Sequence, residues 1–428
     1  MISDIAKSCR EASIITATLS SEMKNLALRT IAKALGTKGE AILRANMEDL
    51  KKAREEGLRD VLYKRLKFDE EKLASSIEGV TSLIQLPDPV GILQMETELD
   101  DGLILRRFSC PIGVLGIVFE SRPDALVQIS CLALKSGNTV LLKGGAEALN
   151  TNRVLFEIIN DAAISEGLPK GWMSLLETRD EVTEMLSLHH VIDLIIPRGS
   201  NEFVQYIMRN TKIPVLGHAD GICHVYVDSK ADMDMAAQIV YDSKCQYPAV
   251  CNAVETLLLH TDIAEKFLLL IKSRFDDAHV EIRGDETVQS YINCKSAQQS
   301  DWQTEYNDLI ISIKIVRSVD EAIAHINLYG SHHTDAIVTE DQNTADRFTG
   351  LVDSANVFLN CSTRFSDGFR YGLGAEVGIS TNKIHARGPV GLEGLTIYKW
   401  RLDGKGHVVA DYAGPGSRKF KHRKVINA

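Results

Sequence analysis

The chain of 428 residues is 44% hydrophobic and 25% charged, a composition typical of a globular protein large enough for two or three domains. Its formal net charge of −10 opposes binding to nucleic acid or to anionic lipid, so neither is an expected partner. The N-terminus has no apolar core of a signal peptide and no window approaches the ~20 apolar residues of a membrane span, so we expect a cytoplasmic protein.

The first region, residues 1–85, carries apolar side chains at three- and four-residue steps and is predicted to be helical. A Pro-containing loop follows. Residues 96–109 then form two apolar runs around Asp100-Asp101-Gly102, which predicts a β-hairpin. Because the hairpin precedes the first buried strand, we expect it to project from the body and to mediate contacts in a homo-oligomer.

From Pro111 onward short apolar runs alternate with amphipathic segments, which predicts α/β units around largely parallel sheets. A strand is expected again at 395–409, followed by a polar tail whose basic end, 417–424, is expected to be frayed. The predicted strands are 114–118, 139–143, 193–196, 222–227, 253–260, 335–339 and 356–360, and the predicted helices include 151–166, 201–211, 232–244 and 262–276.

The eight cysteines are scattered without CxxC spacing, and the twelve histidines include no HxxxH pair. Neither a zinc site nor a disulfide framework is therefore expected, and a reducing compartment fits this cysteine usage. One thiol has an informative position. Cys251 lies between the predicted helix 232–244 and the predicted buried strand 253–260, where rigid elements would hold it and substrate could still reach it, as a covalent catalyst requires. A half-buried structural thiol is the alternative.

Two predicted strands end in residues suited to a phosphate-containing ligand. The strand 139–143 ends in Lys143 and is followed by Gly144 and Gly145, which permit a close approach to the backbone. The strand 193–196 leads into Arg198-Gly199-Ser200 at the start of a helix, where backbone amides bind anions. An ordinary strand-to-helix turn and a simple N-cap by Ser200 are the alternatives, and no GxGxxG fingerprint is present.

Four segments resemble the γ-glutamyl phosphate reductase family, a branch of the aldehyde dehydrogenase superfamily. The resemblance spans nearly the whole chain and is most specific in the last segment. It implies an aldehyde-dehydrogenase-like α/β fold with two parallel α/β domains and a small β oligomerisation hairpin. The segments are 113–122 (GVLGIVFESR), 143–148 (KGGAEA), 246–258 (QYPAVCNAVETLL) and 362–394 (STRFSDGFRYGLGAEVGISTNKIHARGPVGLEG). The implied domains are a nicotinamide cofactor domain (1–95 and 110–218), a catalytic domain (219–394) and an oligomerisation element (96–109 with 395–428).

The same resemblance implies roles for individual residues. Cys251 matches the catalytic thiol, with Asn252 beside it as a weaker catalytic candidate, and Ser121 stands about where the superfamily has its oxyanion asparagine. A backbone amide near Cys251 is the other candidate oxyanion donor. The implied NADPH/NADP+ site comprises Lys143 at the adenosine ribose with Gly144 and Glu147 after it, Arg198, Gly199 and Ser200 at the pyrophosphate or the 2′-phosphate, and Glu376 at the nicotinamide ribose.

The implied substrate, L-glutamyl 5-phosphate, carries a phosphate and an α-carboxylate, so a cationic pocket is required. Arg122, Arg364 and Arg387 lie in the family-specific segments, and guanidinium groups suit bidentate binding of both anions. Surface or salt-bridge roles are the alternatives for each arginine. His385 is a weaker candidate. Functional coupling to a glutamate 5-kinase, which would supply this substrate, is a further expectation.

One departure from the superfamily indicates the direction of the reaction. Aldehyde-oxidising members have a general-base glutamate before a Leu-Gly step, whereas Val215 precedes Leu216-Gly217 here. Valine cannot activate water, so a thioester on Cys251 is expected to exchange with phosphate rather than to hydrolyse. The expected activity is NADPH-dependent reduction of the acyl phosphate to glutamate 5-semialdehyde, in proline biosynthesis. An oxidising or acyl-CoA-linked member of the superfamily and a non-catalytic relative remain alternatives.

Overall fold

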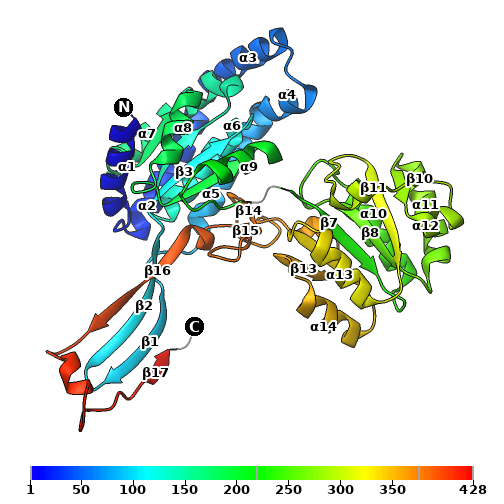
Figure 1. The fold of residues 1–428 in the computed structure, drawn as a ribbon. Coiled ribbons are helices and arrows are strands. Elements are labelled where there is room, and N and C mark those ends of the chain that lie inside the picture. Colours follow the sequence, from blue (N-terminus) through cyan, green and yellow to red (C-terminus); the bar gives the residue numbers. More distant parts are fainter. Residues whose placement is uncertain (1, 218–219, 375, 427–428) are drawn as a thin grey trace.

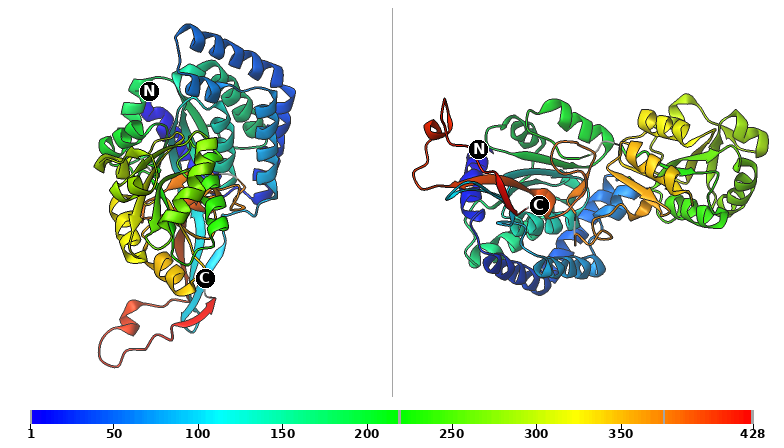
Figure 2. Two further views of the ribbon diagram at one scale, coloured as in Figure 1. Left: turned by 90° about the vertical axis from the view of Figure 1, so that its right-hand side faces the viewer. Right: turned by 90° about the horizontal axis from the view of Figure 1, so that it is seen from below.

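The computed structural model describes residues 2–217, 220–374 and 376–426. Figure 1 shows two α/β bodies and a projecting β arm. The first domain contains the N-terminal helices and a four-stranded sheet, and the second contains a seven-stranded sheet. Seen from below in Figure 2, the two bodies lie side by side. The predicted α/β class with two largely parallel sheets is confirmed.

The N-terminal region is helical, as predicted. Polar side chains fix the helix starts: Ser20 accepts a hydrogen bond from the amide of Met23, and Asp69 accepts one from the amide of Lys72. These helices are α1 (Ile2–Thr16), α2 (Ser21–Thr37), α3 (Gly39–Glu55), α4 (Asp60–Leu66) and α5 (Glu70–Gln85).

The first-domain sheet is parallel, with strand order β5-β4-β3-β6. Its carboxyl edge is formed by the ends of β3, β4 and β6, which is where open α/β sheets bind ligands. The strands are β3 (Val114–Phe119), β4 (Thr139–Lys143), β5 (Met173–Leu176) and β6 (Leu194–Arg198). The connecting helices are α6 (Pro123–Lys135), η1 (Ala146–Ala148), α7 (Leu149–Ser165), α8 (Arg179–Ser187) and α9 (Asn201–Asn210).

Both faces of this sheet are covered by helices. The larger core joins one face to α2, α5, α6 and α7, and includes the fully buried Trp172. A second core joins the opposite face to α1, α8 and α9. Burial on both faces explains why the strands read as continuous apolar runs and could be predicted from the sequence. Strand β5 was not predicted because it is short.

The second-domain sheet is also parallel, with order β10-β9-β11-β8-β7-β12-β13. One apolar core lies between the sheet and α10–α12, and another lies beneath α13 and α14. The strands are β7 (Cys223–Val227), β8 (Val254–His260), β9 (Glu281–Gly284), β10 (Lys295–Ser296), β11 (Ile310–Val316), β12 (Thr334–Val338) and β13 (Asn356–Leu359). The helices are α10 (Met233–Cys245), α11 (Ala264–Asp277), α12 (Glu286–Tyr291), η2 (Gln299–Gln303), α13 (Val319–Tyr329) and α14 (Gln342–Leu351).

The arm is an antiparallel sheet that joins the predicted hairpin to the C-terminal segment. Its order is β16-β2-β1-β17, with strands β1 (Leu93–Asp100), β2 (Leu103–Pro111), β16 (Thr396–Asp403) and β17 (Arg423–Ile426). The expectation of a frayed basic end is wrong. β17 pairs with β1, and Arg423 and Lys421 form ion pairs with Glu98 and Asp101. The tail also contains η5 (Val409–Tyr412).

The segment that follows β13 connects the domains. It contains η3 (Thr363–Phe365), a ribbon of β14 (Gly378–Ser380) and β15 (Gly388–Val390), and η4 (Glu393–Leu395), and Figure 1 shows the ribbon at the junction of the two bodies. Val377, Val390 and Leu395 belong to the larger first-domain core. The expected second-domain boundary at residue 394 is therefore too late, because these apolar side chains pack against the other domain.

The described part of the chain shows neither a membrane-spanning helix nor a cluster of metal ligands. None of its helices is both long and apolar enough to cross a membrane. Within residues 2–217, 220–374 and 376–426, no group of three or more His, Cys, Asp or Glu side chains is placed to hold a metal ion.

Candidate active site

Cys251 lies in the turn between α10 and β8, at the amino edge of the second-domain sheet, and is half-buried. The amide of Ala253 closes the turn by donating to the carbonyl of Val250 at 3.0 Å. The thiol of Cys223, at the start of β7, donates to the carbonyl of Cys251 at 3.2 Å. Gly221 also lies against this turn, where any side chain would collide with the Cys251 backbone. The turn is therefore fixed from several sides while its thiol remains partly exposed.

The cysteines elsewhere in the chain are poor nucleophiles. Burial raises the pKa of their thiols, which keeps them protonated at neutral pH. These cysteines are Cys9, Cys110, Cys131, Cys223, Cys245, Cys294 and Cys361.

A buried ion pair joins the two elements that flank the nucleophile turn. Lys244, in the last turn of α10, donates to Glu255 of β8 at 2.6 Å, and both side chains are fully buried. Burial raises the pKa of Glu255 to about 7, against the opposing charge and hydrogen bond of Lys244. Because each charge compensates the other, the pair ties the end of α10 to the start of β8 on either side of Cys251.

Asn252 connects the nucleophile turn to the family-specific C-terminal segment. Its side-chain amide donates to the carbonyl of Ser366 at 2.7 Å, and Thr363 donates through its hydroxyl to the carbonyl of Asn252 at 2.7 Å. Asn252 therefore holds the 363–366 segment against Cys251. A catalytic role for the residue stays a prediction.

Two arginines, Arg198 and Arg364, are close enough to Cys251 for their charges to interact. The pKa of Arg198 is lowered mainly by burial and further by the charge of the nearby Arg122. The charges of Glu376 and Cys251 raise this pKa. The pKa of Arg364 is lowered by burial and by Arg370 and is opposed by Cys251. Arg65, in the last turn of α4, likewise has its pKa lowered by burial and then by Arg122. Like charges held together in this way favour the binding of an anion.

Ser121 contacts the predicted cofactor residue Glu147 of η1 at the carboxyl edge of the first-domain sheet. Glu147 accepts hydrogen bonds from both the amide (2.8 Å) and the hydroxyl of Ser121. Lys143 ends β4 and donates to the carbonyl of Gly144. In this structure the Ser121 hydroxyl is directed to Glu147, so Ser121 would have to change partner to stabilise an oxyanion.

An acidic side chain occupies the predicted pyrophosphate position at the start of α9. The amide of Ser200 donates to a carboxylate oxygen of Glu120 at 2.9 Å, and a Cβ on Gly199 would lie 2.8 Å from that carboxyl group. Ser200 makes no capping hydrogen bond through its own side chain. The helix amide thus donates to an anionic oxygen of Glu120, and this geometry fits the cofactor phosphate expected there.

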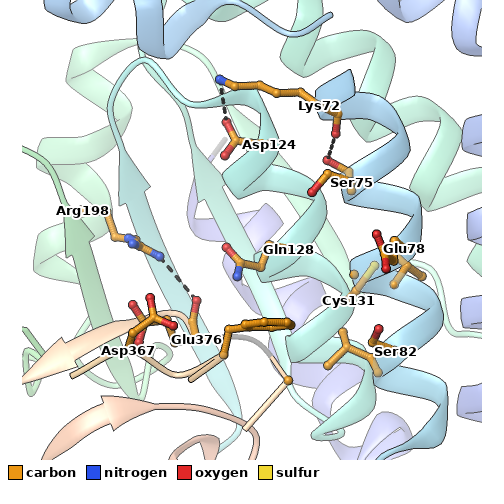
Figure 3. A pocket seen from close by; sticks show the side chains of 16 residues that line it. Lys72, Ser75, Glu78, Ser82, Asp124, Gln128, Cys131, Arg198, Asp367 and Glu376 are labelled. Atoms are coloured by element: carbon orange, nitrogen blue, oxygen red, sulfur yellow. Dashed lines mark hydrogen bonds and ion pairs between the residues drawn. The ribbon is translucent and has the colours of Figure 1, made fainter. Parts of the chain in front are cut away.

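A cavity of about 530 Å³ lies between helices α5 and α6 and the segment that connects the two domains. Figure 3 shows Arg198 and Glu376 on one side of it and Gln128 of α6 near its middle. Arg198 donates to the backbone carbonyl of Glu376 at 3.4 Å, and the Glu376 carboxylate accepts from the amide of Gly368 at 2.8 Å. Arg198 therefore lies beside Glu376 at the cavity, and its part in binding the cofactor stays a prediction.

Two sequence candidates have other partners in the structure. Arg387 forms an ion pair with Asp353 at 3.0 Å, and His385 contacts the carbonyl of Gly394 at 2.9 Å. Substrate binding by Arg387 stays a prediction. The residues that sequence reasoning missed are Glu120, Arg65 and four charged residues that line the cavity, Lys72, Glu78, Asp124 and Asp367. Glu120 could have been found, because it lies in the 113–122 segment directly after β3.

The comparisons with known proteins agree with this geometry. The profile of the Aldehyde dehydrogenase family matches residues 2–302. The γ-glutamyl phosphate reductase of Pelotomaculum thermopropionicum is 59% identical over 424 residues, covering 99% of this chain and 98% of that protein. The protein of the same name from Acetivibrio thermocellus is 58% identical with the same coverage. The crystal structure of γ-glutamyl phosphate reductase from Thermotoga maritima superposes with a TM-score of 0.93 at 40% identity, covering 95% of this chain and 99% of that one.

Proposed function

The chain belongs to the aldehyde dehydrogenase family and, within it, to the γ-glutamyl phosphate reductases, and we propose that it reduces L-glutamyl 5-phosphate to L-glutamate 5-semialdehyde and phosphate in proline biosynthesis. The observation that carries this proposal is the half-buried Cys251, whose charge acts on Arg198 and Arg364, with Arg122 near Arg198. This setting suits a nucleophile whose substrate is an anionic acyl phosphate. A cytoplasmic location is part of the proposal.

The proposed reaction begins when the Cys251 thiolate attacks the γ-carbonyl carbon of the substrate. Phosphate leaves with the electron pair of the broken C–O bond, and a thioester remains on the sulfur. NADPH, when bound, supplies the hydride that reduces the thioester carbon. Cys251 then departs from the resulting thiohemiacetal, and the semialdehyde is released. The surrounding guanidinium groups stabilise the leaving phosphate through charge-assisted hydrogen bonds.

The proposed cofactor site lies along the carboxyl edge of the first-domain sheet. Lys143 and Glu147 would hold the adenosine ribose, the amides around Gly199 and Ser200 would bind the pyrophosphate, and Glu376 would hold the nicotinamide ribose. In support, the Ser200 amide already donates to an anionic oxygen of Glu120. Binding would then require Glu120 to move away.

Val215 supports reduction over oxidation. Its side chain packs against the second core of the first domain, and its carbonyl accepts from Asn382 at 2.7 Å. An apolar group in this position offers no proton acceptor to a water molecule that approaches the thioester. Exchange with phosphate is therefore the proposed fate of the thioester.

The proposed function predicts phosphate-dependent formation of NADPH in the reverse direction. Purified protein is given glutamate 5-semialdehyde and NADP+ with phosphate, with coenzyme A, or with neither. We expect turnover with phosphate only, because Cys251 needs an acceptor other than water. Turnover with coenzyme A alone would indicate an acyl-CoA-linked enzyme, turnover with neither would indicate an oxidising dehydrogenase, and none under any condition would indicate a non-catalytic relative.

The arm is proposed to join copies of this chain. Its sheet ends in β16 and β17, whose exposed apolar side chains include Ile397, Trp400 and Leu402 on one strand and Val425 and Ile426 on the other. An exposed apolar edge strand favours pairing with another chain. Coupling to a glutamate 5-kinase remains an expectation of the pathway.

A further inference from the structure

A lysine and an aspartate that line the cavity form an ion pair without a hydrogen bond. Lys72 Nζ of α5 lies 3.8 Å from Asp124 Oδ1 of α6, beyond hydrogen-bond distance. Asp124 Oδ1 is buried without a hydrogen-bond partner, whereas Lys72 donates one hydrogen bond to the carbonyl of Arg65 at 3.0 Å. Both side chains line the cavity and remain partly exposed (Figure 3). The carboxylate can therefore accept from, and the ammonium donate to, a bound molecule.

Arg198, which lines the same cavity, links these two residues to the nucleophile. Asp124 is in the first turn of α6, two residues after Arg122. Its charge acts on the guanidinium of Arg198, as does the charge of Cys251. In a γ-glutamyl group only two methylene groups separate the acyl carbon from the α-carbon. With the acyl carbon at Cys251, the amino-acid end must lie close to Arg198, and the cavity is the space there.

We propose that Lys72 and Asp124 bind the zwitterionic end of the substrate, with the α-ammonium against Asp124 and the α-carboxylate against Lys72. A lysine–aspartate pair held slightly apart matches a zwitterion, because each partner exchanges a weak contact for a charge-assisted hydrogen bond. This inference rests on the proposed function and makes it more specific: the pair would select α-amino acid aldehydes over simple aldehydes.

The test uses three aldehydes with NADP+ and phosphate. Glutamate 5-semialdehyde carries both charged groups, 5-oxopentanoate lacks the ammonium, and 4-aminobutanal lacks the carboxylate. Asp124→Asn is expected to lower kcat/KM about 10- to 100-fold for the two ammonium-bearing aldehydes, mainly through KM, and to spare 5-oxopentanoate. Lys72→Met is expected to lower it similarly for the two carboxylate-bearing aldehydes and to spare 4-aminobutanal.

Glu71→Gln is the matched control, because it removes an exposed negative charge beside Lys72 that does not line the cavity. We expect it to leave all three values unchanged. Equal losses on all three aldehydes in Asp124→Asn or Lys72→Met, or no loss at all, would overturn the inference and leave the proposed function intact. A wild-type protein inactive on every aldehyde would instead overturn the proposed function, and the inference with it.

Discussion

Replacing Cys251 with serine is expected to lower kcat/KM for phosphate-dependent NADPH formation by about 10⁴-fold or more. Serine preserves the shape of the side chain, but its hydroxyl is not ionised at neutral pH and no base has been arranged to activate it. The turn itself should survive, since its contacts with Cys223 and Ala253 use the backbone of residues 250 and 251. Steady-state rates, together with thermal melting to verify folding, measure the effect.

Cys245→Ser is the matched control for this prediction. Cys245 is the last residue of α10, is half-buried, and has a thiol whose pKa burial raises to about 11. We expect its replacement to leave the rate unchanged and to leave one rapidly alkylated cysteine, Cys251. Full activity in the Cys251→Ser protein would rule out covalent catalysis by this residue.

The Lys244→Met substitution is expected to destabilise the protein by about 3–5 kcal/mol. It leaves Glu255 fully buried with its main compensating charge removed. Methionine fills most of the volume of the lysine stem, so the loss reports the charge rather than a cavity. Urea unfolding followed by the fluorescence of the tryptophans measures it, and activity should fall as well, because the pair holds both ends of the nucleophile turn.

The loss in Lys244→Met should grow with pH. Burial raises the pKa of Glu255 from 4.5 to about 7, and without Lys244 it should rise further. Between the unfolded and folded pKa values the folded state binds more protons, so the free energy of unfolding decreases as pH rises through that window. Lys272→Met, which breaks an exposed pair with Asp276, should cost less than about 0.5 kcal/mol. Equal costs at pH 5 and pH 8 would contradict this account of Glu255.

The parts of the fold that the sequence could predict are those buried on both faces. Strands β3, β4, β7 and β8 were found within one residue at each end because parallel strands between helices are continuously apolar. Strand β11 was missed because it contains Ser312 and Lys314. Ser312 is nevertheless buried, and its hydroxyl is satisfied by Tyr306 at 2.6 Å. The pairing of β17 with β1 was missed because β17 is short and exposed and begins with two basic residues, and no local pattern encodes a partner more than 300 residues away.

The candidate site could likewise be predicted only in part from the sequence. Cys251 and Lys143 stand at the ends of predicted elements, so their placement followed from local sequence and from the family resemblance. The charged surroundings of the site could not be predicted: Arg65, near Arg122, comes from the helical N-terminal region, and the cavity forms only when α5, α6 and the segment that carries Asp367 and Glu376 meet. The partners of Arg387 and Ser121 depend likewise on tertiary contacts, with Asp353 and Glu147.

The most direct test of the central claim is to isolate the acyl-enzyme. The protein is incubated with glutamate 5-semialdehyde and NADP+ without phosphate, quenched in acid, and digested for mass spectrometry. We predict a mass increase of one glutamyl group on Cys251 that persists in buffer and disappears when phosphate is added before the quench. A glutamyl group on another residue, none at all, or one lost equally fast with and without phosphate would contradict the account.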